Sequence, residues 1–317
     1  MIEATGLTKR YGSKTAVDNI TFSVAPGMVT GFLGPNGAGK STTMRLIVGL
    51  DRPTSGSVTV HGQSYVDLRA PLREVGVLLD AKAVHTGRSA LNHLLALGAT
   101  HGIRRKRVDE VIALTGLDSV ARKRVGGFSL GMGQRLGIAA ALLGNPATLI
   151  LDEPVNGLDP EGVIWVRMLA RHLAGEGRTI FLSSHLMSEM ALTADHIIVL
   201  GRGRIIADAP VAEILALATG SSVRVRTPDA ARLSELLAAP EVTITRAEEP
   251  DLLQVAGLSA RRIGELAADG RVILHELSPI TATLEDAYLE LTKDEVEYHA
   301  GTTPTQSHSH ALTKEDR

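Results

Sequence analysis

Residues 34–41 read Gly34-Pro-Asn-Gly-Ala-Gly-Lys-Ser41 and fit the pattern G-x-x-x-x-G-K-[ST]. The apolar run Val29–Leu33 precedes them, and a helical pattern follows from Lys40 to Leu50. Glycines allow backbone N–H groups to turn toward phosphate oxygens, and the N-terminus of a helix adds positive potential. A strand, a glycine-rich turn and a helix in this order therefore predict a loop that binds the phosphates of a nucleotide.

Two residues of this loop carry most of its chemistry. Lys40 is long enough to reach the β- and γ-phosphates, and the Ser41 hydroxyl is a suitable ligand for Mg²⁺. The residues expected to bind the nucleotide here are Gly34, Pro35, Asn36, Gly37, Ala38, Gly39, Lys40, Ser41 and Thr42. The alternative is a glycine-rich turn without a ligand, and the match of both sequence and context argues against it.

A second stretch places two carboxylates after a buried strand. The apolar run Thr148–Leu151 is followed by Asp152, Glu153 and Pro154. Ligands of parallel α/β sheets bind at the C-terminal ends of the strands, where these carboxylates are expected. We expect Asp152 to hold Mg²⁺ through water, and Glu153 to orient or deprotonate a water at the γ-phosphate. An apolar strand before two acids is common, but its pairing with the phosphate loop is specific.

Further motifs complete a resemblance to the ATP-binding subunits of ABC transporters. Phe128–Arg135 (FSLGMGQR) resembles the LSGGQ signature, and Asn156–Asp159 (NGLD) resembles the D-loop. Ser183-Ser184-His185 resembles the segment that carries the switch histidine of the family. Tyr11 stands where family members stack an aromatic ring on adenine. Together these motifs span residues 1 to about 215, roughly two-thirds of the chain.

The resemblance implies that two copies face each other head to tail, as a homodimer or pseudo-dimer, with ATP between them. Ser129 and Gly131 of one copy are then expected at the γ-phosphate that the other copy binds, and Asp159 beside the shared nucleotide. The catalytic residues implied are Lys40, Glu153 and His185. Each assignment has a structural alternative, because Ser129 and Asp159 also suit helix N-caps and His185 suits a strand end.

The sequence departs from the family pattern at two places. The family usually has Gln after the strand that enters the helical subdomain, whereas Asp80 follows Glu74–Leu79 here. A carboxylate at this position can approach Mg²⁺, so the expected metal ligands are Ser41, Asp152 and Asp80. In the signature, Leu130 and Met132 replace the usual Gly and Gln. We expect these changes to alter the rate or the dimer affinity without abolishing function.

The fold class predicted is α/β, a P-loop NTPase of the ABC type with a mixed sheet core, an antiparallel β subdomain and a helical subdomain. Residues 1–218 are expected to form this ATP-binding domain, with the helical subdomain at about 81–145. Residues 219–299 are expected to form a small α+β domain, and residues 300–317 a disordered tail. The second domain alternates strands at 223–227, 241–246, 251–256 and 271–277 with helices at 229–238 and 259–268, the β-α-β-β-α-β order of a ferredoxin-like unit. A last helix is expected at about 282–292.

Composition limits the possible partners and compartments. The chain has 317 residues, 44% of them hydrophobic, no cysteine, and no apolar run long enough to span a membrane. Its first residues lack an apolar signal region, so secretion by that route is not expected. The resemblance therefore implies a separate integral membrane permease, with this chain bound at the cytoplasmic face of the cell membrane.

The charge distribution bears on a nucleic-acid partner. The net charge is −2, and residues 1–218 hold 23 Lys and Arg against 18 Asp and Glu, whereas residues 219–317 hold 10 against 17. No nucleic acid is expected as a partner. The leading hypothesis is an ATPase that powers an exporter of drugs, antibiotics or lipids. A soluble ABC-type ATPase that acts on ribosomes or nucleic acid is the alternative, and a small-molecule kinase would leave the signature and D-loop unexplained.

Overall fold

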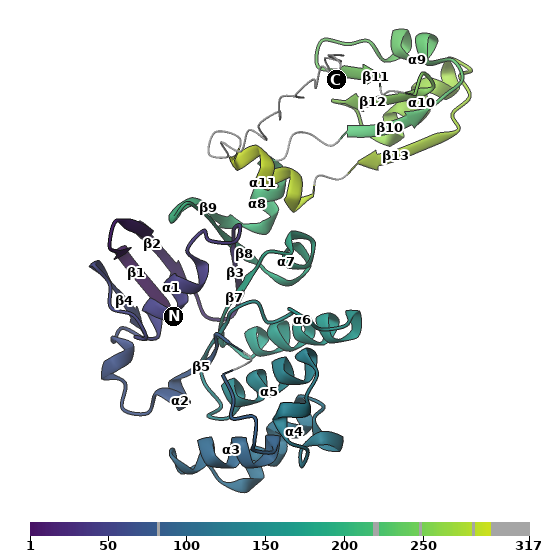
Figure 1. Cartoon of the computed structure of the whole chain (residues 1–317). Coiled ribbons are helices and arrows are strands. Elements are labelled where there is room, and N and C mark those ends of the chain that lie inside the picture. Colours follow the sequence, from purple (N-terminus) through teal and green to yellow (C-terminus); the bar gives the residue numbers. More distant parts are fainter. Residues whose placement is uncertain (81–82, 218–221, 247–248, 281–282, 293–317) are drawn as a thin grey trace, which may run out of the picture.

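The computed structural model describes residues 1–80, 83–217, 222–246, 249–280 and 283–292. Its largest sheet has the strand order β5-β6-β7-β3-β8-β9 (Figure 1). These strands are β3 (Val29–Leu33), β5 (Val75–Leu78), β6 (Thr148–Leu151), β7 (Thr179–Ser184), β8 (His196–Gly201) and β9 (Arg204–Pro210). The first five in this order run parallel, and β9 pairs antiparallel with β8. Strands β3, β6 and β7 are buried along their whole length, as parallel strands covered on both faces should be.

An antiparallel sheet of three strands, β2-β1-β4, lies beside the large one. Its strands are β1 (Ile2–Tyr11), β2 (Lys14–Val24) and β4 (Ser55–Val60). The strand-like composition of the sequence is limited to residues 2–7, 19–24 and 58–61, so it predicts strands shorter than β1 and β2 and a start later than that of β4. Near the turn between β1 and β2 the alternation of apolar and polar residues that marks a strand is lost, because the residues there are mostly polar. In the structure these residues still pair, Tyr11 with Lys14 and Arg10 with Thr15.

Helices and the small sheet bury opposite faces of the large sheet. On one face, Phe22, Phe32 and Phe181 stack on one another with ring centroids 5.1–6.0 Å apart, together with Met44 of α1. On the other face, Leu33 joins a core formed largely by helices. The helices of this part are α1 (Lys40–Ile47), α2 (Pro71–Glu74), α3 (Ala90–Ala99), α4 (Arg105–Leu114), α5 (Leu130–Leu142), α6 (Pro160–Gly175), α7 (Met187–Thr193) and α8 (Val211–Leu217).

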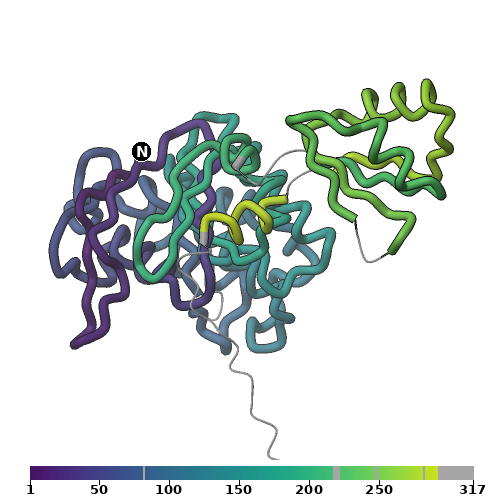
Figure 2. The backbone as a smooth tube through the Cα atoms, turned by 90° about the horizontal axis from the view of Figure 1, so that it is seen from above, coloured from purple at the N-terminus to yellow at the C-terminus, as the bar shows by residue number. Residues whose placement is uncertain are grey.

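A four-stranded antiparallel sheet with the order β11-β12-β10-β13 follows in the chain, and both views show it standing apart from the large sheet (Figures 1 and 2). Its elements are β10 (Ser222–Arg226), α9 (Ala230–Leu237), β11 (Thr243–Arg246), β12 (Leu252–Ala256), α10 (Ala260–Asp269) and β13 (Glu276–Ile280). The β-α-β-β-α-β order expected from the sequence is present. The last strand begins later than the predicted residue 271, because α10 runs to Asp269 and Arg271 turns the chain with φ +53°.

The final helix, α11 (Leu284–Thr292), returns to the first part of the chain. It packs against α8 and α7, and Figure 2 shows it in yellow lying across the part of the molecule that contains the large sheet. Leu284 and Ala287 are buried in the same core as Leu33. This helix falls within residues 219–299, which are expected to form the second domain, whereas it packs on α7 and α8 of the expected ATP-binding domain.

Two predictions concern residues that the structure does not describe. The tail expected at 300–317, and residues 218–221 at the expected domain boundary, lie outside the described residues. Among the helices of the described part, none is long and apolar enough to cross a membrane.

Candidate nucleotide site

The glycine-rich loop joins the end of β3 to α1 and encloses a cavity of about 320 Å³. Gly39 caps the helix with φ +111°, and a Cβ at this position would lie 2.5 Å from the carbonyl oxygen of Ala16. Only glycine fits this close approach of two backbone segments. The residues that line the cavity are Tyr11, Lys14, Ala16, Pro35, Asn36, Gly37, Gly39, Lys40, Ser41, Thr42 and Glu153.

The side chain of Lys40 is almost completely buried at the bottom of this loop. Its Nζ donates to the carbonyl oxygen of Gly34 at 2.6 Å and to that of Pro35 at 3.4 Å. The same atom lies 3.6 Å from Glu153 Oε1. The phosphate loop and the carboxylate after β6 therefore meet at one ammonium group, as the two motifs predicted.

Asp152 and Glu153 are held from the neighbouring strands. The backbone N–H of Asp152 donates to the carbonyl of Leu78 on β5 at 2.7 Å. Ser183 on β7 donates from Oγ to Asp152 Oδ1 at 2.5 Å and accepts from the N–H of Glu153 at 2.9 Å. Ser183 is fully buried, and the sequence motifs do not predict that it holds the carboxylates.

Glu153 lies between the loop lysine and the predicted switch histidine. Its Oε2 is 2.8 Å from His185 Nδ1, and the backbone N–H of His185 donates to the same oxygen at 3.4 Å. The carbonyl oxygen of Glu153 accepts from Gln134 Nε2 at 2.9 Å. Gln134 is not among the predicted site residues, although a glutamine on an otherwise apolar helix is a usable signal, and the structure shows it buried.

Tyr11 stands at the rim of the cavity, at the end of β1. Its ring is 47% exposed, and Lys9 Nζ lies 4.9 Å from the ring centroid. The hydroxyl donates to Asp51 Oδ2 at 2.8 Å, and Arg45 binds the same carboxylate. Partial burial and this hydrogen bond raise the pKa of Tyr11, while the hydrogen bond from Arg45 lowers the pKa of Asp51. The ring is thus fixed in place with part of its surface open.

The signature and D-loop residues occupy two helix N-termini. Ser129 accepts from the N–H of Met132 at 3.2 Å and caps α5, while Asp159 accepts from Gly162 at 2.9 Å and caps α6. Both residues are thus helix N-caps, and their expected roles at the nucleotide of a second copy stay predictions. Within the part of the chain that the structure describes, neither Ser129 nor Gly131 lines the cavity of its own copy.

Leu130, the residue that departs from the family signature, contacts the D-loop. It is 50% exposed and lies over Gly157, where a Cβ would come within 2.2 Å of Leu130 Cδ2. Gly157 has φ +73°, so glycine suits this position for two reasons. The larger side chain in the signature is matched by the smallest residue in the D-loop.

Asp80 follows β5, and β5 is the sheet neighbour of the strand that carries Asp152. The hydrogen bond from Asp152 N–H to Leu78 places the two chain segments side by side. Asp80 is exposed at this edge, and residues 81–82, which follow it, lie outside the described residues.

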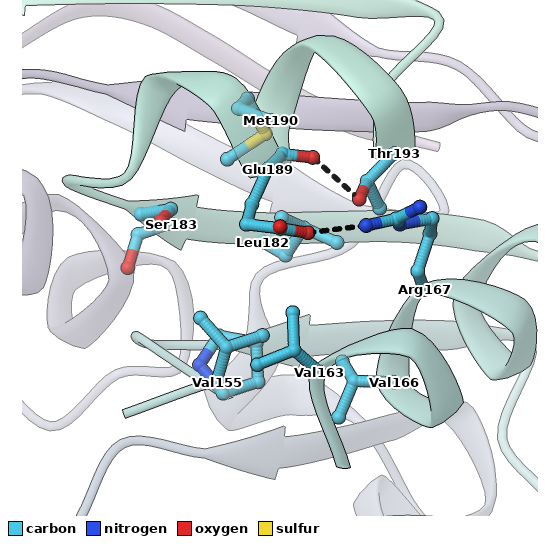
Figure 3. A pocket seen from close by; sticks show the side chains of 11 residues that line it. Val155, Val163, Val166, Arg167, Leu182, Ser183, Glu189, Met190 and Thr193 are labelled. Atoms are coloured by element: carbon cyan, nitrogen blue, oxygen red, sulfur yellow. Dashed lines mark hydrogen bonds and ion pairs between the residues drawn. The ribbon is translucent and has the colours of Figure 1, made fainter. Parts of the chain in front are cut away.

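A second, smaller cavity of about 20 Å³ lies between α6, α7 and β7 (Figure 3). Arg167 pairs with Glu189 across it, with 2.5 Å between Nη2 and Oε2, and Thr193 donates to the Glu189 carbonyl at 2.7 Å. Arg167 Nε is buried without a hydrogen-bond partner among the described atoms, and the cavity is large enough for one water. This ion pair fixes α7, which begins two residues after His185.

Comparisons with known proteins agree with this geometry. A family model described as ABC transporter matches residues 17–156. The Bacitracin transport ATP-binding protein BcrA of Bacillus licheniformis is 43% identical over 213 residues, which are 66% of this chain and 70% of that protein. The uncharacterized ABC transporter ATP-binding protein YhcH of Bacillus subtilis is 34% identical over 312 residues, 94% and 99% of the two chains. This chain belongs to the ABC transporter ATP-binding family.

Other relatives extend the similarity of this ABC subunit to drug resistance proteins and solved structures. The Daunorubicin resistance ATP-binding protein DrrA3 of Streptomyces coeruleorubidus is 33% identical over 93% of this chain and 96% of its own. A dimeric, post-hydrolysis structure of the ATP-binding cassette MJ0796 with ADP and Pi superposes with a TM-score of 0.61 and 26% identity, over 67% and 99% of the two chains. A family model for a domain of unknown function matches residues 221–285.

The predicted fold class and family are therefore confirmed, as is the activity of this ABC subunit, ATP hydrolysis that drives transport by a membrane permease. No comparison supports the alternative of a ribosome-associated ATPase.

Proposed function

We propose that this chain powers the export of an antibiotic or a similar drug. The support for the cargo class comes from relatives whose names specify bacitracin transport, lantibiotic transport and daunorubicin resistance. The observation that carries the hydrolytic mechanism is the arrangement of Lys40, Glu153 and His185 at one end of the loop cavity, with Glu153 within 3.6 Å of Lys40 and 2.8 Å of His185.

Each of these side chains has a distinct task at the γ-phosphate. Lys40 presents a buried positive charge, and in the nucleotide complex a phosphate oxygen takes the place of the carbonyl oxygens that it now contacts. Glu153 accepts a proton from the attacking water, since a carboxylate within hydrogen-bond reach is a suitable general base. His185 holds the Glu153 carboxylate and lies close to the transferred phosphate. Tyr11 stacks on the adenine at the rim of the cavity.

The donors near the loop suit Mg²⁺. Ser41 offers a hydroxyl and Asp152 a carboxylate whose orientation Ser183 fixes, and oxygen donors of this kind are the ligands that Mg²⁺ prefers. No cluster of three or more acidic or histidine side chains suited to a metal ion exists among the described residues, which fits an ion held by few protein groups and by phosphate oxygens. Bound Mg²⁺ would neutralise charge on the phosphates. Asp80 lies at the same edge of the sheet and can approach the ion.

A second copy completes the site. Ser129 and Gly131 lie at the N-terminus of α5, which favours an anion, and the Ser129 hydroxyl that accepts from the Met132 N–H keeps its own hydrogen to donate. In a head-to-tail dimer these groups bind the γ-phosphate held by the other copy, and Asp159 lies beside it. ATP then stabilises the closed dimer, and hydrolysis removes the bridging phosphate.

We further propose a location and a division of labour. Residues 1–218 form the ATP-binding domain, bound to a permease at the cytoplasmic face of the membrane. Residues 219–280 form a module that supports the dimer, and α11 anchors this module to the ATP-binding domain through α8 and α7.

The substitution Glu153→Gln tests the mechanism. The amide keeps the shape of the side chain but cannot accept the proton, so hydrolysis should fall by about 10²–10⁴-fold while ATP affinity is retained. Steady-state phosphate release and fluorescent ATP binding measure the two quantities. Turnover close to that of the wild type would contradict the role of Glu153. Glu161→Gln, an exposed acid in the first turn of α6, is the matched control and should leave both values unchanged.

A further inference from the structure

Glu153 has a backbone conformation that is uncommon for a residue with a side chain. Its φ is +49°, in the left-handed region that favours glycine. Such a conformation persists only where the surrounding structure holds it. The groups that bind the backbone of Glu153 therefore decide where its carboxylate points.

Two side chains hold the two backbone polar groups of Glu153. Ser183 on β7 accepts from its N–H at 2.9 Å, and Gln134 on α5 donates to its carbonyl oxygen at 2.9 Å. Gln134 is only 4% exposed, so water has little access to replace the bond. The same carbonyl also accepts from the backbone N–H of Asn156 at 3.2 Å, so the loss of Gln134 leaves it with this longer hydrogen bond alone, which favours rearrangement of the peptide.

We propose that Gln134 is a positioning residue for ATP hydrolysis. By holding the carbonyl of Glu153 it keeps the peptide in the left-handed conformation and keeps the carboxylate between Lys40 and His185. This inference rests on the proposed role of Glu153. Without the Gln134 donor, the peptide relaxes toward a common φ below zero and the carboxylate turns away from the attacking water.

The position of Gln134 also connects the two sites of the dimer. It lies on the helix that Ser129 caps, and Ser129 is proposed to bind the nucleotide of the other copy. At its start this helix touches the D-loop through Leu130 and Gly157, and further along it reaches Glu153 through Gln134. α5 therefore contacts the Glu153–Asp159 segment at two points, and links the phosphate bound by one copy to the general base of the other.

The substitution Gln134→Met removes the donor at similar side-chain length. We expect kcat for ATP hydrolysis to fall about tenfold, in keeping with the loss of one buried hydrogen bond, while KM for ATP stays unchanged. Gln134→Glu keeps the shape but presents an acceptor to the carbonyl, and should lower kcat at least as much. The matched control is Arg135→Met. Its guanidinium donates to Thr115 and stacks on Trp165, so its loss should lower the melting temperature and leave kcat within twofold.

A double-mutant cycle separates positioning from general destabilisation. In the Glu153→Gln background, Gln134→Met should have no further effect on the residual hydrolysis, because it acts through the missing carboxylate. Wild-type kcat in both Gln134 variants, or a tenfold loss that recurs in the Glu153→Gln background, would overturn the inference. Normal turnover of Glu153→Gln alone would instead refute the role of Glu153.

Discussion

Replacing Leu284 by alanine tests whether α11 is part of the ATP-binding unit. Leu284 is 1% exposed and lies in the core that also contains Leu33 of β3 and Val166 of α6. The substitution removes apolar contacts and leaves a cavity, a combination that costs about 2–5 kcal/mol at fully buried leucines. We therefore expect the free energy of unfolding of the ATP-binding unit to fall by an amount in this range.

The same helix offers a matched control. Leu289 lies five residues further along and is 62% exposed, so Leu289→Ala should change the free energy of unfolding by less than about 0.5 kcal/mol. Both variants keep the helix propensity of alanine, and they differ in the burial of the side chain removed.

Tryptophan fluorescence during urea unfolding is the assay. The chain has one tryptophan, Trp165, and it lies on α6 in the ATP-binding unit, so its signal reports the unfolding of that unit. The Leu284→Ala transition should move to lower urea concentration, and the Leu289→Ala transition should overlay that of the wild type. Coincident transitions for Leu284→Ala and the wild type would refute the assignment of α11 to this unit.

Three other substitutions probe the loop and the helical subdomain. Lys40→Ala removes the ammonium that meets Gly34 and Glu153, so ATP affinity should drop and turnover should vanish; unchanged ATP affinity in a binding titration would contradict its role as a phosphate ligand. Gly39→Ala should abolish ATP binding or folding, because its Cβ would meet a backbone oxygen at 2.5 Å, and a fully active variant would count against the close approach. His93 is buried and its Nδ1 has no hydrogen-bond partner among the residues that the structure describes, and burial, then the charge of Arg88, lower its pKa. The imidazole of His93 therefore binds a proton more readily in the unfolded chain than in the folded one. As the pH is lowered from about 7.5 to 5.5, the free energy of unfolding should fall, and it should fall by less in His93→Leu. Equal losses in the wild type and in His93→Leu, measured by urea titration, would exclude His93 as the cause.

The local motifs could be predicted from the sequence because each contains its own structural context. The order of strand, glycine turn and helix is enough to predict that Lys40 lies in a phosphate-binding loop. The apolar run of β6 is likewise enough to predict that Glu153 lies at the C-terminal end of a buried strand. The helix at 282–292 was equally clear from its apolar spacing.

Long-range contacts could not be predicted in the same way. The left-handed φ of Glu153 and its bond to Gln134 depend on how α5 approaches β6, which no local pattern records. Nothing in the apolar face of α11 says whether it covers the C-terminal sheet or α7 and α8. The match of Leu130 with Gly157 likewise becomes visible only when the signature and the D-loop are side by side.

A complementation assay tests most directly whether two copies share each ATP. Lys40→Ala disables the loop side of the site and Ser129→Arg the opposing side, so each variant alone should be inactive. In a head-to-tail dimer, mixing the two variants creates heterodimers in which one site has both wild-type halves, and about a quarter of the wild-type turnover should return. If the mixture stays as inactive as its components while the two variants are shown to pair, the shared site is contradicted.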